Sequence, residues 1–573
     1  LYGFFNIKHF TANKKPLTLH HRKFKHTVTM KRPFIKLNAV DILATTLFLV
    51  FIITWFNYQT EVSFHKMYSI ATYVLPYVAF RLIASKDYYH FWKRIILIIL
   101  SVCAIWQSIY AILQVIGICE SHNFMFTITG SFHNPGPFGG FLAICASLFI
   151  PSIQEEAYRF LRILYSAATI LCIILLPATL SRTALLALGI SMLIYALSFQ
   201  YFRDTIRRYW IIAVVGISLC GVCAYLYKKD SANGRFYINK ISAIAMRDNG
   251  FKGSGLGKFS TTYGETQANY FAPYIDNIIQ GDAPKKIEQE RMIADCPEYA
   301  FNEYMEIGVE CGIAGIVTFI ILTLTAIWIL YKAKSIWCYG LITLSIFALF
   351  SYPFKIVPFC IFEGLFIAMA GIKANKGIKT YAPIHITAIL AITFIIAGFS
   401  KISSSKKAEK LLEKSITLYD IKYYEPFAEE CYPLIKDLSH NYTFLFQLGQ
   451  SLNKCGEYEK SDSILTLGSS ISCDPMFWNI MGNNAIAQGN YERAKECYTK
   501  AFCMIPNRLY PLSLLAKMYH ENGDTAAFLH LSNAINSFVP KVESELTKEL
   551  REEINLIIHE SYLQKPAPTP ARY

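Results

Sequence analysis

Long apolar runs, separated by short polar connections, constrain this chain more than any other feature. A helix needs roughly 20 apolar residues to cross a hydrocarbon core about 30 Å thick. Hydropathy predicts about eleven such helices, at residues 39–57, 66–84, 95–117, 137–153, 161–178, 183–200, 209–227, 307–331, 336–351, 355–372 and 383–400. Hydrophobic residues make up 53% of the chain, more than the roughly 45–50% usual in soluble domains. The sequence therefore predicts an all-α fold, a polytopic helical membrane bundle of about eleven spans.

The basic residues of the connections predict the orientation, because loops rich in lysine and arginine stay in the cytoplasm. Such residues follow every second span: Lys86, Lys93, Arg94, Arg159, Arg162, Arg203, Arg207, Arg208, Lys332, Lys334, Lys373, Lys376 and Lys379. This alternation predicts a cytoplasmic N-terminus. It places everything after Lys401 on the opposite side of the membrane.

The net charge of +14 does not indicate nucleic-acid binding, because much of the excess lies in these connections and in the first 36 residues. Residues 1–29 are basic and precede Met30, which stands directly before the first span. We expect 1–29 to be an extension outside the native structure. Residues 30–400 are predicted to form the membrane domain, with a large loop at 228–306.

The fifteen cysteines show no zinc-like spacing. Cys220 and Cys223 lie inside an apolar span, where packing is the more usual role. The sequence therefore predicts neither redox chemistry nor a metal or other cofactor.

Glycines recur at intervals of 33 or 34 residues beyond Lys401: Gly449 and Gly482, then Gly456, Gly489 and Gly523. A period of this length predicts stacked helix pairs. The best copy has Trp478, Met481, Gly482, Ala485, Gly489, Tyr491, Ala494, Tyr498, Ala501 and Pro506, and this pattern resembles the tetratricopeptide repeat. The resemblance implies a soluble α-solenoid over 401–563, with weaker units around 424–434 and 512–531. Residues 564–573 are Pro-rich and are expected to be disordered.

Tetratricopeptide stacks are more often binding surfaces than catalysts. We therefore expect a protein partner on these repeats, with structural capping as the alternative.

The connection at 129–140 is predicted on the same side as the repeats, and its glycines and prolines allow a backbone turn. Asn134 is either a substrate ligand or a helix cap. His133 is a candidate base, since histidine changes charge near neutral pH.

Cationic side chains mark the other connections on this side. Arg182 opens a span, where a guanidinium either binds phosphate oxygens bidentately or reaches lipid head groups. The large loop carries Arg235, Arg247 and a glycine-rich segment, 250–259, which includes Gly255, Gly257 and Lys258. Exposed backbone N–H groups and cations suit a diphosphate, although a flexible loop is the alternative. The charged stretch 280–295 is expected to be a solvated helix.

Four of these motifs, in order, resemble the O-antigen ligase and polymerase superfamily: Gly-x-Phe-x-Asn-Pro at 130–135, Ser-Arg-x-Ala at 181–184, Gly-x-Gly-x-Gly-x-Phe at 253–259, and Asn302 before a helix with Glu310. Phe301 stands where the family usually has histidine. Glu310 and Glu363 lie within spans and are expected to face the bundle interior.

The resemblance implies a metal-independent transferase in the bacterial inner membrane, with its C-terminal domain in the periplasm. Such enzymes move a glycan from undecaprenyl diphosphate to an acceptor hydroxyl, on lipid A core or on protein. An O-antigen polymerase and a non-catalytic repeat scaffold are the alternatives.

The chemistry assigns roles to the candidate residues. Arg182 and Arg235 would stabilise the leaving diphosphate, and His133, Glu303 or Glu298 would take the acceptor's proton. The predicted substrate-binding residues are Asn134, Arg247, Gly255, Gly257, Lys258 and Asn302.

Overall fold

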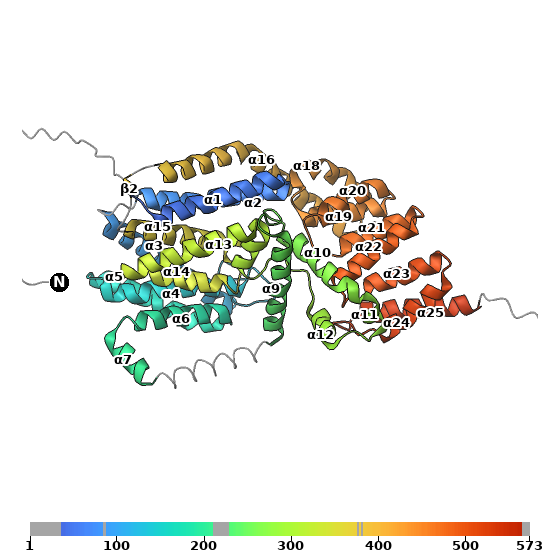
Figure 1. The fold of residues 1–573 in the computed structure, drawn as a ribbon, viewed down its shortest axis with the longest axis horizontal. Coiled ribbons are helices and arrows are strands. Elements are labelled where there is room, and N and C mark those ends of the chain that lie inside the picture. Colours follow the sequence, from blue (N-terminus) through green and yellow to red (C-terminus); the bar gives the residue numbers. More distant parts are fainter. Residues whose placement is uncertain (1–35, 84–87, 210–228, 375–377, 380–381, 564–573) are drawn as a thin grey trace, which may run out of the picture. The chain divides into compact units, whose positions relative to one another are not determined.

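The computed structural model describes residues 36–83, 88–209, 229–374, 378–379 and 382–563 (Figure 1). All of these residues belong to one compact unit. The predicted extension at 1–29, the tail at 564–573 and almost all of the predicted span at 209–227 lie outside the described residues. Within them, secondary structure is helical except for β1 (Lys36–Leu37) and β2 (Ile378–Lys379), which pair antiparallel.

Each predicted span within the described residues coincides with a helix. These helices are α1 (Ala39–Tyr58), α2 (Glu61–Ile83), α3 (Tyr89–Val115), α4 (Pro135–Glu155), α5 (Arg159–Ala178), α6 (Arg182–Ala196), α13 (Glu303–Lys332), α14 (Trp337–Ala348), α15 (Val357–Lys373) and α16 (Ala382–Asp420). Six of them, α1, α3, α4, α5, α13 and α16, are long and apolar enough to cross a membrane, and α6 and α14 are shorter apolar helices. α7 (Gln200–Arg208) follows α6. The described part of the chain is therefore a helical membrane protein.

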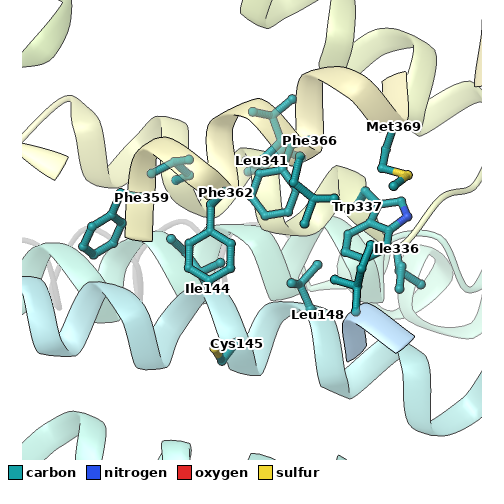
Figure 2. Packing of buried hydrophobic residues seen from close by; sticks show 14 of the residues in the cluster. Ile144, Cys145, Leu148, Ile336, Trp337, Leu341, Phe359, Phe362, Phe366 and Met369 are labelled. Atoms are coloured by element: carbon teal, nitrogen blue, oxygen red, sulfur yellow. The ribbon is translucent and has the colours of Figure 1, made fainter. Parts of the chain in front are cut away.

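The core of the bundle lies where α4 meets α14 and α15, because α4 is apolar around its whole circumference and almost completely buried. Figure 2 shows Ile144 and Leu148 of α4 facing Trp337 of α14 and Phe362 of α15. A Cβ atom at Gly340 would lie 2.6 Å from the ring of Phe366. Glycine in α14 therefore permits an approach that any larger residue would block.

Basic connections predicted on the cytoplasmic side meet at one end of the bundle. Lys373 Nζ lies 3.6 Å from the ring centroid of Tyr89, and the Tyr89 hydroxyl is 3.4 Å from Ser335 Oγ. Arg94 and Glu156 form an ion pair at 3.2 Å. These residues belong to connections that follow every second predicted span, and the predicted orientation places all of those connections on the same side of the membrane.

Two further groups of helices are formed by the large loop, which interrupts the bundle helices in the chain, and by the C-terminal region, which follows them. The loop between α7 and α13 forms α9 (Lys229–Asn249), α10 (Phe259–Phe271), η2 (Ala272–Tyr274), α11 (Ile275–Gln280) and α12 (Lys285–Ile293). The C-terminal helices are α17 (Tyr424–Cys431), η4 (Tyr432–Leu434), α18 (Ile435–Leu438), α19 (Tyr442–Lys454), α20 (Tyr458–Ser469), α21 (Met476–Ala487), α22 (Tyr491–Met504), α23 (Tyr510–Glu521), α24 (Thr525–Ser537) and α25 (Glu545–Leu563). From α19 to α24, each helix packs on the next.

The recurring glycines of the C-terminal helices have two physical roles. Gly456, Gly489 and Gly523 occupy the turns between paired helices with φ near +80°, +74° and +78°, a conformation that costs glycine little. Gly482 lies at a helix crossing, where a Cβ atom would lie 2.3 Å from the Tyr498 ring. The turn glycine recurs in all three helix pairs and the crossing glycine in the first two, Gly449 and Gly482, which explains the period seen in the sequence.

The large loop is packed against the C-terminal helices. Buried side chains of α9, α10 and α12 join those of α22 to α25 in one hydrophobic cluster. The expectation of a solvated helix over 280–295 holds only in part: Lys285 and Lys286 of α12 are exposed, but Arg291 is buried and donates to the carbonyls of Pro506 and Val539, each at 3.1 Å. The charged side chains of this stretch therefore belong partly to an internal interface.

A disulfide joins Cys296, which follows α12, to Cys473, which precedes α21. The two cysteines are 177 residues apart in the chain. Cysteine spacing gave no indication of this pair, so the expectation that the cysteines carry no redox chemistry missed a covalent link between the loop and the C-terminal helices.

Candidate active site

Arg182 and Arg235 lie close together although a long stretch of chain separates them. Arg182 is the first residue of α6, and Arg235 lies in the first turns of α9. Burial lowers the pKa of Arg235, and the neighbouring charge of Arg182 lowers it further. Arg235 Nη1 donates to the carbonyl of Phe350 at 2.6 Å. The charges of the two guanidinium groups therefore repel each other, and a bound anion would relieve the repulsion.

Aromatic rings connect Arg235 to the next cationic group. Its Cζ lies 5.4 Å from the ring centroid of Phe301, a cation–π distance. Phe301 contacts Tyr352 edge to face at 5.5 Å, and Tyr352 stacks on Tyr299 at 5.1 Å. Lys355 Nζ lies 5.3 Å from the Tyr299 centroid. Phe301, at the position where the resemblance implied a histidine, is therefore an aromatic contact of Arg235.

The backbone at Phe301 has an unusual conformation, and a helix cap follows it. Its φ is +50°, a region that bulky side chains rarely adopt. The next residue, Asn302, caps α13 by accepting from the N–H groups of Tyr304 at 3.1 Å and Met305 at 3.3 Å. The turn before α13 thus leads directly into a helix capped by Asn302, and it places the Phe301 ring against Arg235.

Three glutamates in the first turns of α13 face two lysines from other helices. Glu306 pairs with Lys66 of α2 at 2.9 Å and with Lys355, the last residue of η3 (Pro353–Lys355). Glu310 pairs with Lys66 at 2.7 Å. Glu303 is buried and accepts from the backbone N–H of Phe354 at 2.7 Å. Among the described residues, Glu303 has no ion pair within 4.0 Å, so its carboxylate is the least neutralised of the three.

The glycine-rich segment is seated on α13, whose helical geometry is interrupted at Gly312. The N–H of Gly255 donates to the carbonyl of Glu310 at 3.0 Å, and that of Ser254 to Val309 at 2.9 Å. A Cβ atom at Gly253 would lie 2.4 Å from the Glu310 carbonyl oxygen. Glycines here allow two backbones to approach closely, and the contact holds Glu310 in place.

A cavity of about 930 Å³ opens between α1, α2, α13, α15 and α16. We call it the membrane cavity. Lys66, Lys355 and the three glutamates of α13 line it, as does Glu363 of α15, which was expected to face the interior. The remaining walls are mostly apolar, including Leu47, Phe48, Phe51, Ile70, Val74, Leu322 and Ile367. Such a cavity suits a molecule with a long apolar part and a charged group.

Other predicted site residues lie elsewhere. His133 is exposed, with its ring 5.7 Å from that of His122. Asn134 caps α4 by accepting from the N–H of Gly136 at 2.8 Å. Gly257 lines the membrane cavity, whereas Arg247 and Lys258 line a second one. Among the described residues, no group of His, Cys, Asp and Glu is placed to hold a metal ion.

Lys66, Lys355 and Glu306 were missed by the sequence analysis. Each stands at or near the edge of a predicted apolar run, where a lysine is easily attributed to the membrane surface. The rule that ionisable residues in membrane helices tend to pair with one another was applied only to Glu310 and Glu363. The same rule, applied to residues at the ends of the apolar runs, would have indicated Lys66, Lys355 and Glu306 as candidates.

The comparisons with known proteins concern this same region. Residues 167–320 match the model of a family described as O-Antigen ligase. This part of the chain is O-antigen ligase-like. The match includes Arg182, Arg235, the glycine-rich segment and the glutamates of α13, and it indicates a membrane glycan transferase of the O-antigen ligase or polymerase type. The comparisons with curated proteins and with solved structures found no match.

Proposed function

We propose that this protein transfers a glycan from undecaprenyl diphosphate to an acceptor hydroxyl at the periplasmic face of a bacterial inner membrane. The observation that carries the proposal is the pair Arg182 and Arg235, brought together from α6 and α9 within the O-antigen ligase-like segment. The apolar membrane cavity is suited to the polyprenyl chain, and the paired guanidinium groups to the diphosphate.

In the proposed reaction, Glu303 takes the proton of the acceptor hydroxyl as its oxygen attacks the anomeric carbon of the glycan. The bond from that carbon to the phosphate oxygen breaks, and its electron pair leaves with undecaprenyl diphosphate. Arg182 and Arg235 stabilise the charge that develops on the leaving group. We prefer Glu303 to His133 as the base because Glu303 is buried two residues after Phe301, whose ring lies 5.4 Å from Arg235 Cζ, whereas His133 is exposed.

Two further features support the periplasmic location. The Cys296–Cys473 disulfide joins the loop to the C-terminal helices, and such bonds persist in oxidising compartments such as the periplasm. The connections predicted on that side also meet: Ser181 Oγ donates to the Gly136 carbonyl at 3.5 Å, and Arg235 reaches Phe350 between α14 and α15.

The C-terminal helices are proposed to form a tetratricopeptide α-solenoid over 401–563. Their pairing and their turn glycines support this reading. Part of their surface is covered by α10 and α12, so the stack also supports the loop that carries Arg235. A protein partner or a large acceptor, lipid A core or protein, would use the remaining surface.

A deletion strain complemented with variants tests the proposal. Wild type is expected to restore transfer, whereas Arg182→Ala and Arg235→Ala should each reduce it roughly 10²–10³-fold, as for loss of one transition-state donor. Arg159→Ala is the matched control, because Arg159 is exposed at the other end of the α5–α6 pair. Transfer at the wild-type rate by both site variants at equal protein level would contradict the proposal.

The glycan profile of the deletion strain also identifies the acceptor. Free lipid A core with accumulated carrier-linked polymer means a ligase, and unmodified secreted proteins mean a protein transferase. Single repeat units mean a polymerase, the second candidate within the same family. A glycan profile identical to that of the wild-type strain would favour the non-catalytic scaffold over all three transferases.

A further inference from the structure

A second cavity, of about 760 Å³, lies outside the bundle between α9, α10, the end of α1 and the end of α20. We call it the polar groove. Its lining includes Tyr58, Lys258, Thr262, Glu265 and Asn269, together with Tyr270. The volume falls in the range of roughly 300–1,000 Å³ usual for small-molecule sites.

One face of α10 supplies the polar side chains. Lys258, which precedes the helix, and Thr262, Glu265 and Asn269 recur at the spacing of a single helical face. In the described part of the chain, the side chains of Lys258, Glu265 and Asn269 make no hydrogen bond to protein groups. The opposite face of α10 is buried: Phe259, Tyr263 and Phe271 join the hydrophobic cluster with the C-terminal helices, and Gln267 donates to the carbonyl of Met504. The helix is thus held rigidly with donors and acceptors aimed at the groove.

Two tyrosine rings in the groove are fixed by their own hydroxyls. Tyr58 donates to the carbonyl of Gly253 at 2.6 Å. Tyr270 donates to Glu290 at 2.5 Å and accepts from Lys240 at 2.8 Å. Lys240 Nζ lies 4.3 Å from the ring centroid of Tyr270 and Lys258 Nζ 5.8 Å from that of Tyr58, so each ring carries a lysine on one side and lends the rest of its apolar body to the groove lining. A pyranose needs this combination, because it presents C–H groups on one face and hydroxyls around its edge.

The charges of the groove do not suit a diphosphate. Lys258 is balanced by Glu265, and Arg247 is paired with Asp248 at 2.9 Å. Neutral hydroxyls and amides make up much of the remaining polar lining. A ligand with many hydroxyl groups and little net charge fits this lining better than a polyanion.

The polar groove and the membrane cavity share a short segment of backbone. Leu256 and Gly257 line the membrane cavity, and the flanking residues Ser254 and Lys258 line the polar groove. We propose that the polar groove binds sugar units of the saccharide substrate while the diphosphate and lipid occupy the bundle side. The proposal rests on the proposed transfer function, and the sugars belong either to the donor glycan or to a glycan acceptor.

The test uses the full-length protein in detergent and the double variant Glu265→Ala/Asn269→Ala. The matched control is Gln488→Ala/Glu492→Ala, which removes an exposed amide and an exposed acid from α21's end and α22. One arm measures equilibrium binding of the strain's repeat-unit oligosaccharide, released from its lipid by mild acid. The other measures transfer kinetics with the donor varied and then with the acceptor varied.

The groove variant is expected to weaken oligosaccharide binding about tenfold or more, the effect of losing about two hydrogen bonds. KM should rise more than kcat falls, for the donor if the groove holds the donor glycan and for the acceptor if it holds the acceptor's sugars. The control should match wild type in both arms.

The proposal would be overturned if the groove variant bound oligosaccharide as tightly as wild type and showed the same KM. It would also be overturned if the wild-type protein bound no oligosaccharide, or if it bound an acceptor peptide through Glu265 and Asn269. Failure of the proposed transfer function gives a different result from failure of the groove assignment. If wild type transfers no glycan but binds oligosaccharide through Glu265 and Asn269, the transfer function falls and the groove assignment stands.

Discussion

Lys66 pairs with two buried glutamates, whereas Lys355 pairs with one of them, and this predicts an asymmetry between the two lysines of the membrane cavity. In Lys66→Met, Glu306 keeps Lys355, but Glu310 loses its only ion pair among the described residues. In Lys355→Met, Glu306 keeps Lys66 at 2.9 Å and Glu310 keeps its own pair. Lys66→Met is therefore the more disruptive change.

The magnitude follows from burial. Removing one partner of a buried ion pair costs about 3–5 kcal/mol, because the remaining charge is left uncompensated. The Glu310 side chain is 3% exposed and that of Lys66 24%, so we expect the lower end, about 3 kcal/mol. Lys355→Met removes one of two contacts to Glu306, and about 1 kcal/mol is expected.

Thermal unfolding of the detergent-solubilised protein measures the difference. Lys66→Met should lower the midpoint clearly more than Lys355→Met, and Lys66→Met/Glu310→Gln should recover most of the loss by removing the orphaned charge. Equal destabilisation by the two lysine variants, or no recovery in the double variant, would refute this reasoning.

Three further predictions concern the C-terminal helices. Gly482→Val should destabilise them by about 1–3 kcal/mol, since its Cβ would lie 2.3 Å from the facing tyrosine ring, and limited proteolysis would detect the change. His440 stacks on His65 at 3.5 Å, and burial holds the pKa of His440 below its ordinary 6.5. The neutral form is therefore favoured in the folded state, so the contribution of His440 to stability is complete above about pH 6.5 and falls on acidification. His440→Gln should therefore make the thermal midpoint less dependent on pH between about pH 7 and 5. Cleavage at a protease site engineered between Cys296 and Cys473 should leave the fragments linked until reductant is added, and separation without reductant would exclude the disulfide.

The sequence predicted the local elements and part of the site. Apolar runs and recurring glycines depend on nearby residues, so the helices of the bundle and the C-terminal helix pairs were predictable. The meeting of Arg182 with Arg235 was also predictable, because the alternating basic connections placed both on one side of the membrane.

Contacts between distant segments were not predictable. Lys66 and Glu306 are 240 residues apart, and Arg291 reaches carbonyls 215 and 248 residues away. No periodicity or spacing links such residues, since their proximity follows only from the packing of whole helices. The packing of the loop against the C-terminal helices, and with it the polar groove, therefore required the structure.

The most direct test of the account is the transfer rate of purified protein with a polyprenyl diphosphate-linked glycan and an acceptor. We predict that Arg182→Ala and Arg235→Ala each lower kcat/KM roughly 10²–10³-fold. The double variant should lose much less than the product of the two, because both arginines serve one leaving group. Full rates in either single variant, with folded protein in the membrane, would contradict the assignment of this arginine pair to the diphosphate.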